Sequence, residues 1–195
     1  MERLDGRTLR ETLRRDGRLS PRRAREILRG VCEAADAAHR RQLIHRDLKP
    51  ENIFLAREGE RETAKVLDFG IAKFLPASIQ PTADTGTGVL VGTLQYMAPE
   101  QLAGGAPAPS WDLWALAIVC YEVLAGAHPF AGVHPAAWQQ AVAAGRWTPI
   151  NDHVPEATPR LQEFFTHALA AEPAERPATA MMLVAEFDRA LGAQS

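Results

Sequence analysis

Four polar side chains among the first 68 residues combine residue types suited to proton transfer, metal binding and phosphate neutralisation. Asp47, Lys49 and Asn52 lie close together in the segment His45-Arg46-Asp47-Leu48-Lys49-Pro50-Glu51-Asn52, and Asp68 follows in Asp68-Phe69-Gly70. Carboxylate and amide oxygens suit Mg²⁺, and a lysine ammonium can neutralise a phosphate as a point charge. Each short motif alone is weak evidence, since an isolated Asp-Phe-Gly is an ordinary turn. The order in which the motifs occur is more informative.

Three motifs follow one another: the 45–52 segment, Asp68-Phe69-Gly70, and Ala98-Pro99-Glu100. This order resembles the catalytic loop, metal-binding turn and activation-segment end of protein kinases. The resemblance implies Mg²⁺-assisted transfer of the γ-phosphate of ATP to a protein Ser or Thr. By the same resemblance, Asp47 accepts or orients the substrate hydroxyl proton, Asn52 and Asp68 bind Mg²⁺, and Lys49 neutralises the transferring phosphate.

The stretch Gly92-Thr93-Leu94-Gln95-Tyr96-Met97-Ala98-Pro99-Glu100-Gln101 is similar to the substrate-docking end of the activation segment in bacterial eukaryotic-like Ser/Thr kinases. The resemblance implies that Thr93 contacts Asp47 and Lys49 and favours Ser/Thr substrates. A lysine two residues after the catalytic aspartate is also typical of Ser/Thr kinases rather than tyrosine kinases.

Several further residues match structural or regulatory positions of that family. Asp112 corresponds to the buried aspartate that anchors the catalytic-loop backbone, and Glu100 with Arg176 corresponds to a buried ion pair. Arg46 is expected to bind a phosphorylated residue of the activation loop. The remaining candidates of this group are His45, within the first motif, and the threonines Thr85 and Thr87; the alternative for these threonines is a polar loop without a role.

The first residues of the chain resemble a kinase hinge. The resemblance implies that Met1, Glu2 and Leu4 meet adenine, while Phe54 and Leu67 line its lower face. The Gly-rich loop, the strand lysine and its helix glutamate are then expected before residue 1, in an N-terminal lobe supplied by a longer chain. Without that lobe, nucleotide would lie on an open surface, and we expect the isolated chain to be inactive.

The segments that carry and connect these motifs predict a mainly α protein with a small β element (α+β), like the C-terminal lobe of a kinase. Short apolar runs at 43–44, 53–55 and 65–67 predict strands, with a hairpin turn over 57–63. Residues 71–93 are expected to form the activation loop within one partial kinase domain over 1–195. Capping residues and apolar periodicity predict helices over 8–15, 21–38, 112–124, 135–144 and 159–170, with a last helix capped by Thr179.

Bulk properties exclude several classes of protein. Hydrophobic residues make up 46% of the 195 positions, which is enough for a core, and the formal net charge of −2 gives no electrostatic case for nucleic acid. Arginines crowd the first thirty positions without interleaved aromatic residues, which favours a solvated helical face. Cys32 and Cys120 lie in apolar helical patterns and are expected to be core residues. Neither a signal peptide nor a membrane segment is predicted, so we expect a cytoplasmic protein.

Two hypotheses from different classes remain. The first is the catalytic lobe of a Ser/Thr protein kinase, incomplete and inactive alone. The alternative is a non-enzymatic, kinase-like scaffold or competitor that binds a kinase or its substrate. A small-molecule kinase is less consistent with Lys49-Pro50 and Ala98-Pro99-Glu100, which are protein-kinase features.

Overall fold

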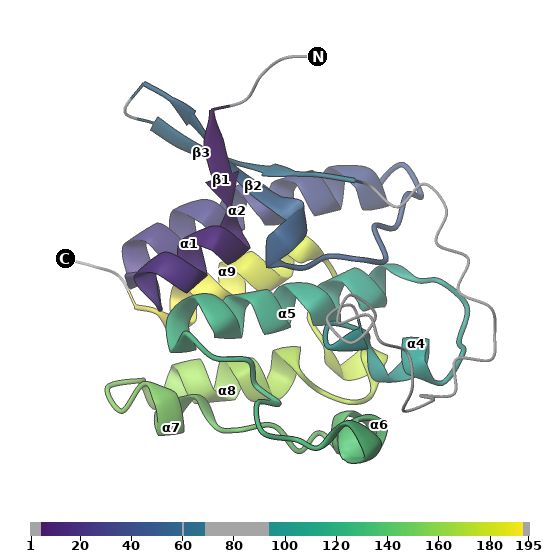
Figure 1. The fold of residues 1–195 in the computed structure, drawn as a ribbon. Helices are drawn as coiled ribbons and strands as arrows, with labels where there is room; N and C mark the ends of the chain where they lie inside the picture. The colour runs from purple at the N-terminus through teal and green to yellow at the C-terminus, as the bar shows by residue number, and fades with distance from the viewer. Residues whose placement is uncertain (1–4, 60, 69–93, 193–195) are drawn as a thin grey trace.

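The computed structural model describes residues 5–59, 61–68 and 94–192. In this part of the chain, a small antiparallel sheet lies at one end of a stack of helices (Figure 1). The prediction of a mainly α protein with a small β element is confirmed. Among the described helices, none combines the length and the apolar character that crossing a membrane requires.

Helix α5 (Pro109–Ala125) is the centre of the core, and all of its residues from Trp111 to Leu124 are buried. It packs against α2 (Pro21–His39), α8 (Pro159–Ala168) and α9 (Ala180–Ala190), which explains its apolar sequence on every side. Gly126 ends the helix in the left-handed conformation with φ 70°. The helix begins one turn earlier than the predicted start at residue 112 because Pro109 suits the first helical position.

Serine and threonine side chains cap the starts of three other helices, and the predicted caps at Ser20 and Thr179 are confirmed. Thr8 forms a capping box with Glu11 at the start of α1 (Leu9–Asp16), and Ser20 caps α2. Thr179 caps α9. The predicted helix over 135–144 is instead a 3₁₀ turn, η2 (Pro135–Ala137), followed by α6 (Trp138–Ala143). The remaining short helical elements are η1 (Pro50–Asn52), α4 (Pro99–Leu102), α7 (Ile150–His153) and η3 (Pro173–Glu175).

The sheet consists of β1 (Gly6–Thr8), β2 (Ile53–Glu58) and β3 (Arg61–Val66), in the order β1-β2-β3. The β2–β3 turn is tighter than predicted, because Glu58 already pairs with Arg61. Ile53 and Leu55 point into the core, so the alternate residues of β2 lie on the other face of the hairpin.

The predicted strand at 43–44 is wrong. Residues 43 and 44 follow the end of α2, where the Leu43 N–H donates to the Ala38 carbonyl and Gln42 adopts φ 61°. Leu43 is 55% exposed. This turn redirects the chain toward the N-terminal end of α5, where an aspartate takes up the next backbone N–H groups.

Candidate active site

One buried carboxylate fixes the backbone that carries the first motif. Asp112, 1% exposed at the start of α5, accepts the His45 N–H at 2.8 Å through Oδ2 and the Arg46 N–H at 2.9 Å through Oδ1. His39 Nε2 lies 2.7 Å from the same Oδ2. These bonds hold Arg46 at φ 65°, a conformation that costs energy for a residue with a side chain. The loop is therefore set by its contact with the central helix.

The loop brings Asp47, Lys49 and Asn52 into direct contact. Lys49 Nζ donates to Asp47 Oδ1 at 2.9 Å, and Asn52 Nδ2 donates to the Asp47 carbonyl at 2.8 Å and to Asp47 Oδ2 at 3.2 Å. The Asp47 and Lys49 side chains are 16% and 14% exposed, so they remain within reach of a substrate. Because the amide nitrogen of Asn52 is turned toward Asp47, its amide oxygen is available to a cation.

The β2–β3 register brings Asp68 near Asn52. Ile53 pairs with Val66, and the Leu67 N–H continues the ladder by donating to the Asn52 carbonyl at 2.8 Å. Asp68 is the next residue, exposed and with φ 49°. His45 Nε2 lies 2.8 Å from the Leu67 carbonyl and so joins the first motif to the second. Asn52 and Asp68 therefore lie at the same end of the hairpin, and their amide and carboxylate oxygens are of the kind that suits a hard cation such as Mg²⁺.

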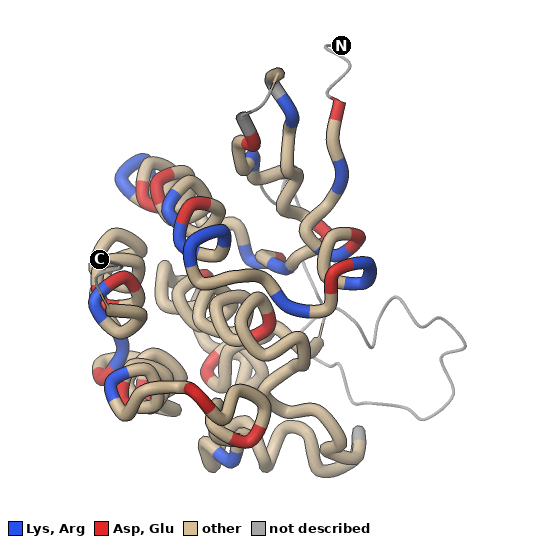
Figure 2. The backbone as a smooth tube through the Cα atoms, turned by 90° about the vertical axis from the view of Figure 1, so that its left-hand side faces the viewer, with Lys and Arg blue, Asp and Glu red and all other residues tan. Residues whose placement is uncertain are grey.

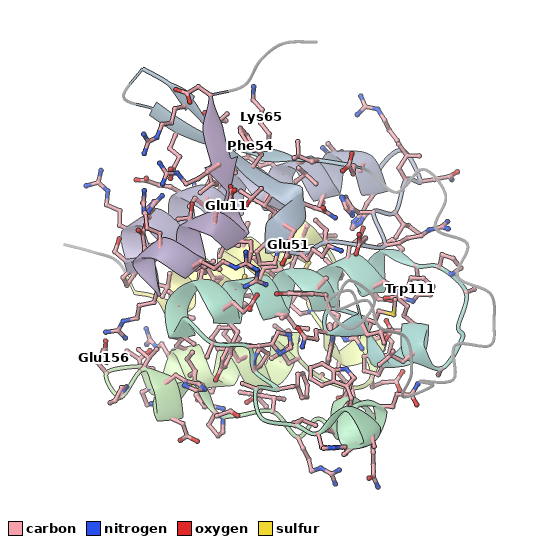
Figure 3. All side chains as sticks on the ribbon, viewed as in Figure 1. Glu11, Glu51, Phe54, Lys65, Trp111 and Glu156 are labelled. Atoms are coloured by element: carbon pink, nitrogen blue, oxygen red, sulfur yellow. The ribbon has the colours of Figure 1, made fainter. Side chains whose placement is uncertain are left out.

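Phe54 and Leu67 lie on the same face of the hairpin as Asn52. Phe54 is opposite Lys65 in the register, and Leu67 is opposite Asn52, so the two-residue period places all four on the face away from the core. Both apolar side chains are half-buried. Figure 3 shows Phe54 and Lys65 at the sheet, with Glu51 at the adjoining turn. An apolar surface beside Asn52 could contact a nucleotide base.

Glu100 and Arg176 form a bidentate ion pair. Arg176 Nη1 and Nη2 donate to Glu100 Oε1 and Oε2 at 2.9 and 2.8 Å, and the Arg176 side chain is 0% exposed. Burial alone would raise the pKa of the Glu100 carboxyl, but the hydrogen bonds and charge of Arg176, a backbone hydrogen bond and the Ser110 hydroxyl together lower that pKa. The guanidinium carbon of Arg176, Cζ, also lies over the Trp114 ring, 4.9 Å from the ring centroid. The pair fixes α4, which carries the third motif, to the chain before α9.

Sequence reasoning missed a second polar network, formed by Arg10, Glu51, Tyr96 and Glu122. Arg10 Nε donates to Glu51 Oε1 at 2.7 Å, and its Nη2 donates to the Tyr96 hydroxyl. That hydroxyl donates in turn to Glu122. Burial raises the pKa of both Tyr96 and Glu122. The prediction of a solvated face is therefore wrong for Arg10, whose side chain is only 21% exposed.

The available signal for this network was Glu122, a charged residue within the otherwise apolar run of α5. A buried acid needs partners, but its sequence does not say that they come from α1 and from residue 96. Figure 2 shows basic residues gathered on the helices of the N-terminal half, and Arg10 belongs to one of these helices, α1. The residues that Arg10 contacts lie 41 to 112 positions away from it in the sequence, so helical periodicity could not predict them.

Several predicted site residues fall outside the part of the chain that the structure describes. They are Met1, Glu2 and Leu4 of the predicted adenine site, Phe69 and Gly70 of the second motif, and Thr85, Thr87 and Thr93 of the predicted activation loop.

Comparison with known proteins supplies independent evidence. The protein kinase domain family matches residues 1–187. The chain is 38% identical to the serine/threonine-protein kinase PknB of Mycolicibacterium smegmatis, over 97% of this chain and 29% of the relative. It is 36% identical to the serine/threonine-protein kinase PknL of Mycobacterium tuberculosis, over 96% of this chain and 45% of the relative. The chain thus spans less than half the length of either relative.

Solved structures agree with the sequence relatives. The crystal structure of the Mycobacterium tuberculosis PknI kinase domain superposes with a TM-score of 0.71 at 25% sequence identity. That superposition covers 97% of this chain and 64% of the solved one. The shared fold therefore includes the sheet and the helices that carry the three motifs.

Proposed function

The chain belongs to the protein kinase domain family, and on this basis we propose that it forms the catalytic lobe of a Ser/Thr protein kinase. The observation that carries the proposal is the contact of Lys49 and Asn52 with Asp47 on a loop anchored by Asp112. Phosphoryl transfer depends chiefly on positioning and charge stabilisation, and this arrangement supports a role in both.

In this proposal Asp47 receives or orients the proton of the attacking Ser or Thr hydroxyl. Lys49 and Asn52 both donate hydrogen bonds to its carboxylate, so the orientation of this carboxylate is fixed before the substrate binds. Lys49 neutralises charge that develops on the transferring phosphate. The oxygen of the Asn52 amide and the carboxylate of Asp68 would hold Mg²⁺, which would neutralise negative charge on the phosphates.

Phe54 and Leu67 would contact the lower side of the adenine, and Met1, Glu2 and Leu4 would supply the hinge. The half-buried apolar face beside Asn52 supports the first part of this proposal. Hinge contacts remain a proposal from family resemblance, as do the substrate preference set by Thr93 and the pairing of Arg46 with phosphorylated Thr85 or Thr87.

Efficient transfer also requires a Gly-rich loop over the phosphates, and residues 1–195 contain no Gly-x-Gly-x-x-Gly motif. We therefore propose that a further lobe completes the nucleotide site and excludes water from it. Relatives that extend well beyond the matched part are compatible with this arrangement. The alternative of a non-enzymatic scaffold is not favoured, because the relatives carry the name of Ser/Thr kinases.

Nucleotide binding tests the proposed metal site. Calorimetric titration of the full-length natural polypeptide with ATP should show tighter binding in Mg²⁺ than in EDTA. Asp68→Asn should reduce the Mg²⁺-dependent affinity by about tenfold or more, since it removes the charged ligand. Glu156→Gln is a matched control, because this acid is 65% exposed and lies far from the hairpin (Figure 3). Equal affinity with and without Mg²⁺, or an unaffected Asp68→Asn variant, would contradict the proposal.

A further inference from the structure

Two buried N–H donors beneath the proposed catalytic loop have no hydrogen-bond acceptor among the described residues. They are the indole Nε1 of Trp111 and the guanidinium Nε of Arg46. Trp111 is 8% exposed, and Figure 3 places it at the N-terminal end of α5. Buried donors are normally paired, so two unpaired donors in one place point to a missing acceptor.

The two residues that carry these donors line the same small cavity, together with Asp112, Tyr96 and Gln101. The cavity has a volume of about 10 Å³. This is about the room that one water molecule needs, and it is too little for a phosphate or a nucleotide. A site for a buried water must also offer several polar partners, and this cavity does so.

We propose that a single structural water molecule binds in this cavity and connects Trp111, Arg46 and Asp112. Its two lone pairs accept the indole and guanidinium N–H groups. One of its hydrogens is donated to Asp112 Oδ1, which accepts the Arg46 backbone N–H and retains a second lone pair. The water thereby pairs both donors through one ligand.

This water makes Trp111 a positioning residue for the catalytic loop, a consequence that rests on the proposed function. The Arg46 backbone, at φ 65°, donates its N–H to Asp112 Oδ1 at 2.9 Å, and its carbonyl accepts from Gln101 Nε2 at 3.5 Å. The water adds a link from the Arg46 side chain to the same carboxylate. Trp111 thus helps to hold the residue that immediately precedes Asp47, although it does not contact substrate.

The chain provides its own controls. Trp114 and Trp138 also carry buried indole N–H groups without a partner in the described part of the chain, but neither residue lines this cavity. If none of these unpaired indole N–H groups contacted a water molecule, all three would lack a cross-peak to water. The proposal requires that Trp111 alone among them contacts a long-lived water.

Nuclear magnetic resonance distinguishes these cases without any measurement of kinase activity. In the ¹⁵N-labelled chain, the indole signal of Trp111 is assigned by its loss in Trp111→Phe. We expect cross-peaks between this proton and water with opposite signs in NOE and ROE spectra, which indicate dipolar contact rather than exchange. The Trp114 and Trp138 signals should lack them. Absence of the Trp111 cross-peak, or equal cross-peaks for all three indoles, would overturn the proposal.

Hydrogen exchange tests the link to the loop. Trp111→Phe keeps the aromatic volume and removes the donor, so exchange of the Arg46 amide should accelerate about fivefold, as expected for one lost hydrogen bond. Trp138→Phe removes a buried indole N–H outside the cavity and should leave that rate unchanged. Equal acceleration in both variants would assign the effect to general destabilisation and refute the positioning role. Because neither readout needs ATP, failure here is separable from failure of the proposed function.

Discussion

Removing the Arg176 guanidinium should destabilise the fold by more than the substitution of any exposed residue. Its five hydrogen bonds go to both oxygens of Glu100 and to the carbonyls of Ala170, Ala171 and Ser110, at 2.8 to 3.1 Å. Arg176→Met retains a similar apolar volume but removes a donor from three carbonyls and leaves the Glu100 carboxylate with the Ser110 hydroxyl alone among its side-chain donors in the described residues. Breaking a buried pair by removing one partner costs about 3–5 kcal/mol. Glu100 is 21% exposed and can be partly hydrated, so we expect about 3 kcal/mol.

Urea unfolding followed by tryptophan fluorescence measures this difference in the free energy of unfolding. Arg189→Met is the matched control, because Arg189 is exposed on the neighbouring helix α9, and it should change stability by less than about 0.5 kcal/mol. Glu100→Gln should be milder than Arg176→Met, since an amide oxygen still accepts from Arg176. A loss below about 1 kcal/mol for Arg176→Met, or a loss equal to that of Arg189→Met, would refute this reasoning.

Three further variants test other contacts. Asp112→Asn replaces a carboxylate that accepts three hydrogen bonds, so amide exchange at His45 and Arg46 should accelerate and stability should fall by about 3 kcal/mol. Burial lowers the pKa of His128 to about 4, below its unfolded value of about 6.5, so protonation of the unfolded state should remove about 2 kcal/mol of stability between pH 7 and pH 5. This loss should be absent in His128→Gln, and unfolding curves at both pH values check it. Tyr96→Phe should cost about 1.5–3 kcal/mol by removing the hydroxyl between Arg10 and Glu122, again measured by urea unfolding.

Local chemistry accounts for the parts of the fold that the sequence predicts. Ser20 and Thr179 cap helices because their side-chain oxygens satisfy backbone N–H groups a few residues away. Gly126 ends α5 because glycine adopts a positive φ without strain. Such signals act over one helical turn, so a single sequence contains all the information that they need.

The errors occur where distant contacts decide the conformation. Leu43 is apolar but exposed, because the chain there turns toward Asp112 instead of pairing in a sheet. Arg10 lies in an arginine-rich helix whose composition predicts a solvated face, yet it binds Glu51 and contacts the buried Glu122. Neither outcome follows from periodicity, because both partners lie far away in sequence.

The candidate site shows the same division. The first motif places Asp47, Lys49 and Asn52 near one another within a single loop, and the structure brings them into contact. The proximity of Asp68 to Asn52 depends on the register of a hairpin, which the sequence indicates only through short apolar runs. The roles of these residues come from family resemblance and stay predictions until activity is measured.

Phosphate transfer by the natural polypeptide tests the central claim most directly. With Mg²⁺ and γ-labelled ATP, the full-length protein should label Ser and Thr residues of peptide substrates. Asp47→Asn should lower kcat by about 10²-fold or more while the protein stays folded, because it removes the group that orients the hydroxyl. Glu156→Gln should retain the wild-type rate. Transfer by Asp47→Asn at the wild-type rate, or no transfer from a folded full-length protein that binds Mg²⁺ and ATP, would contradict the account.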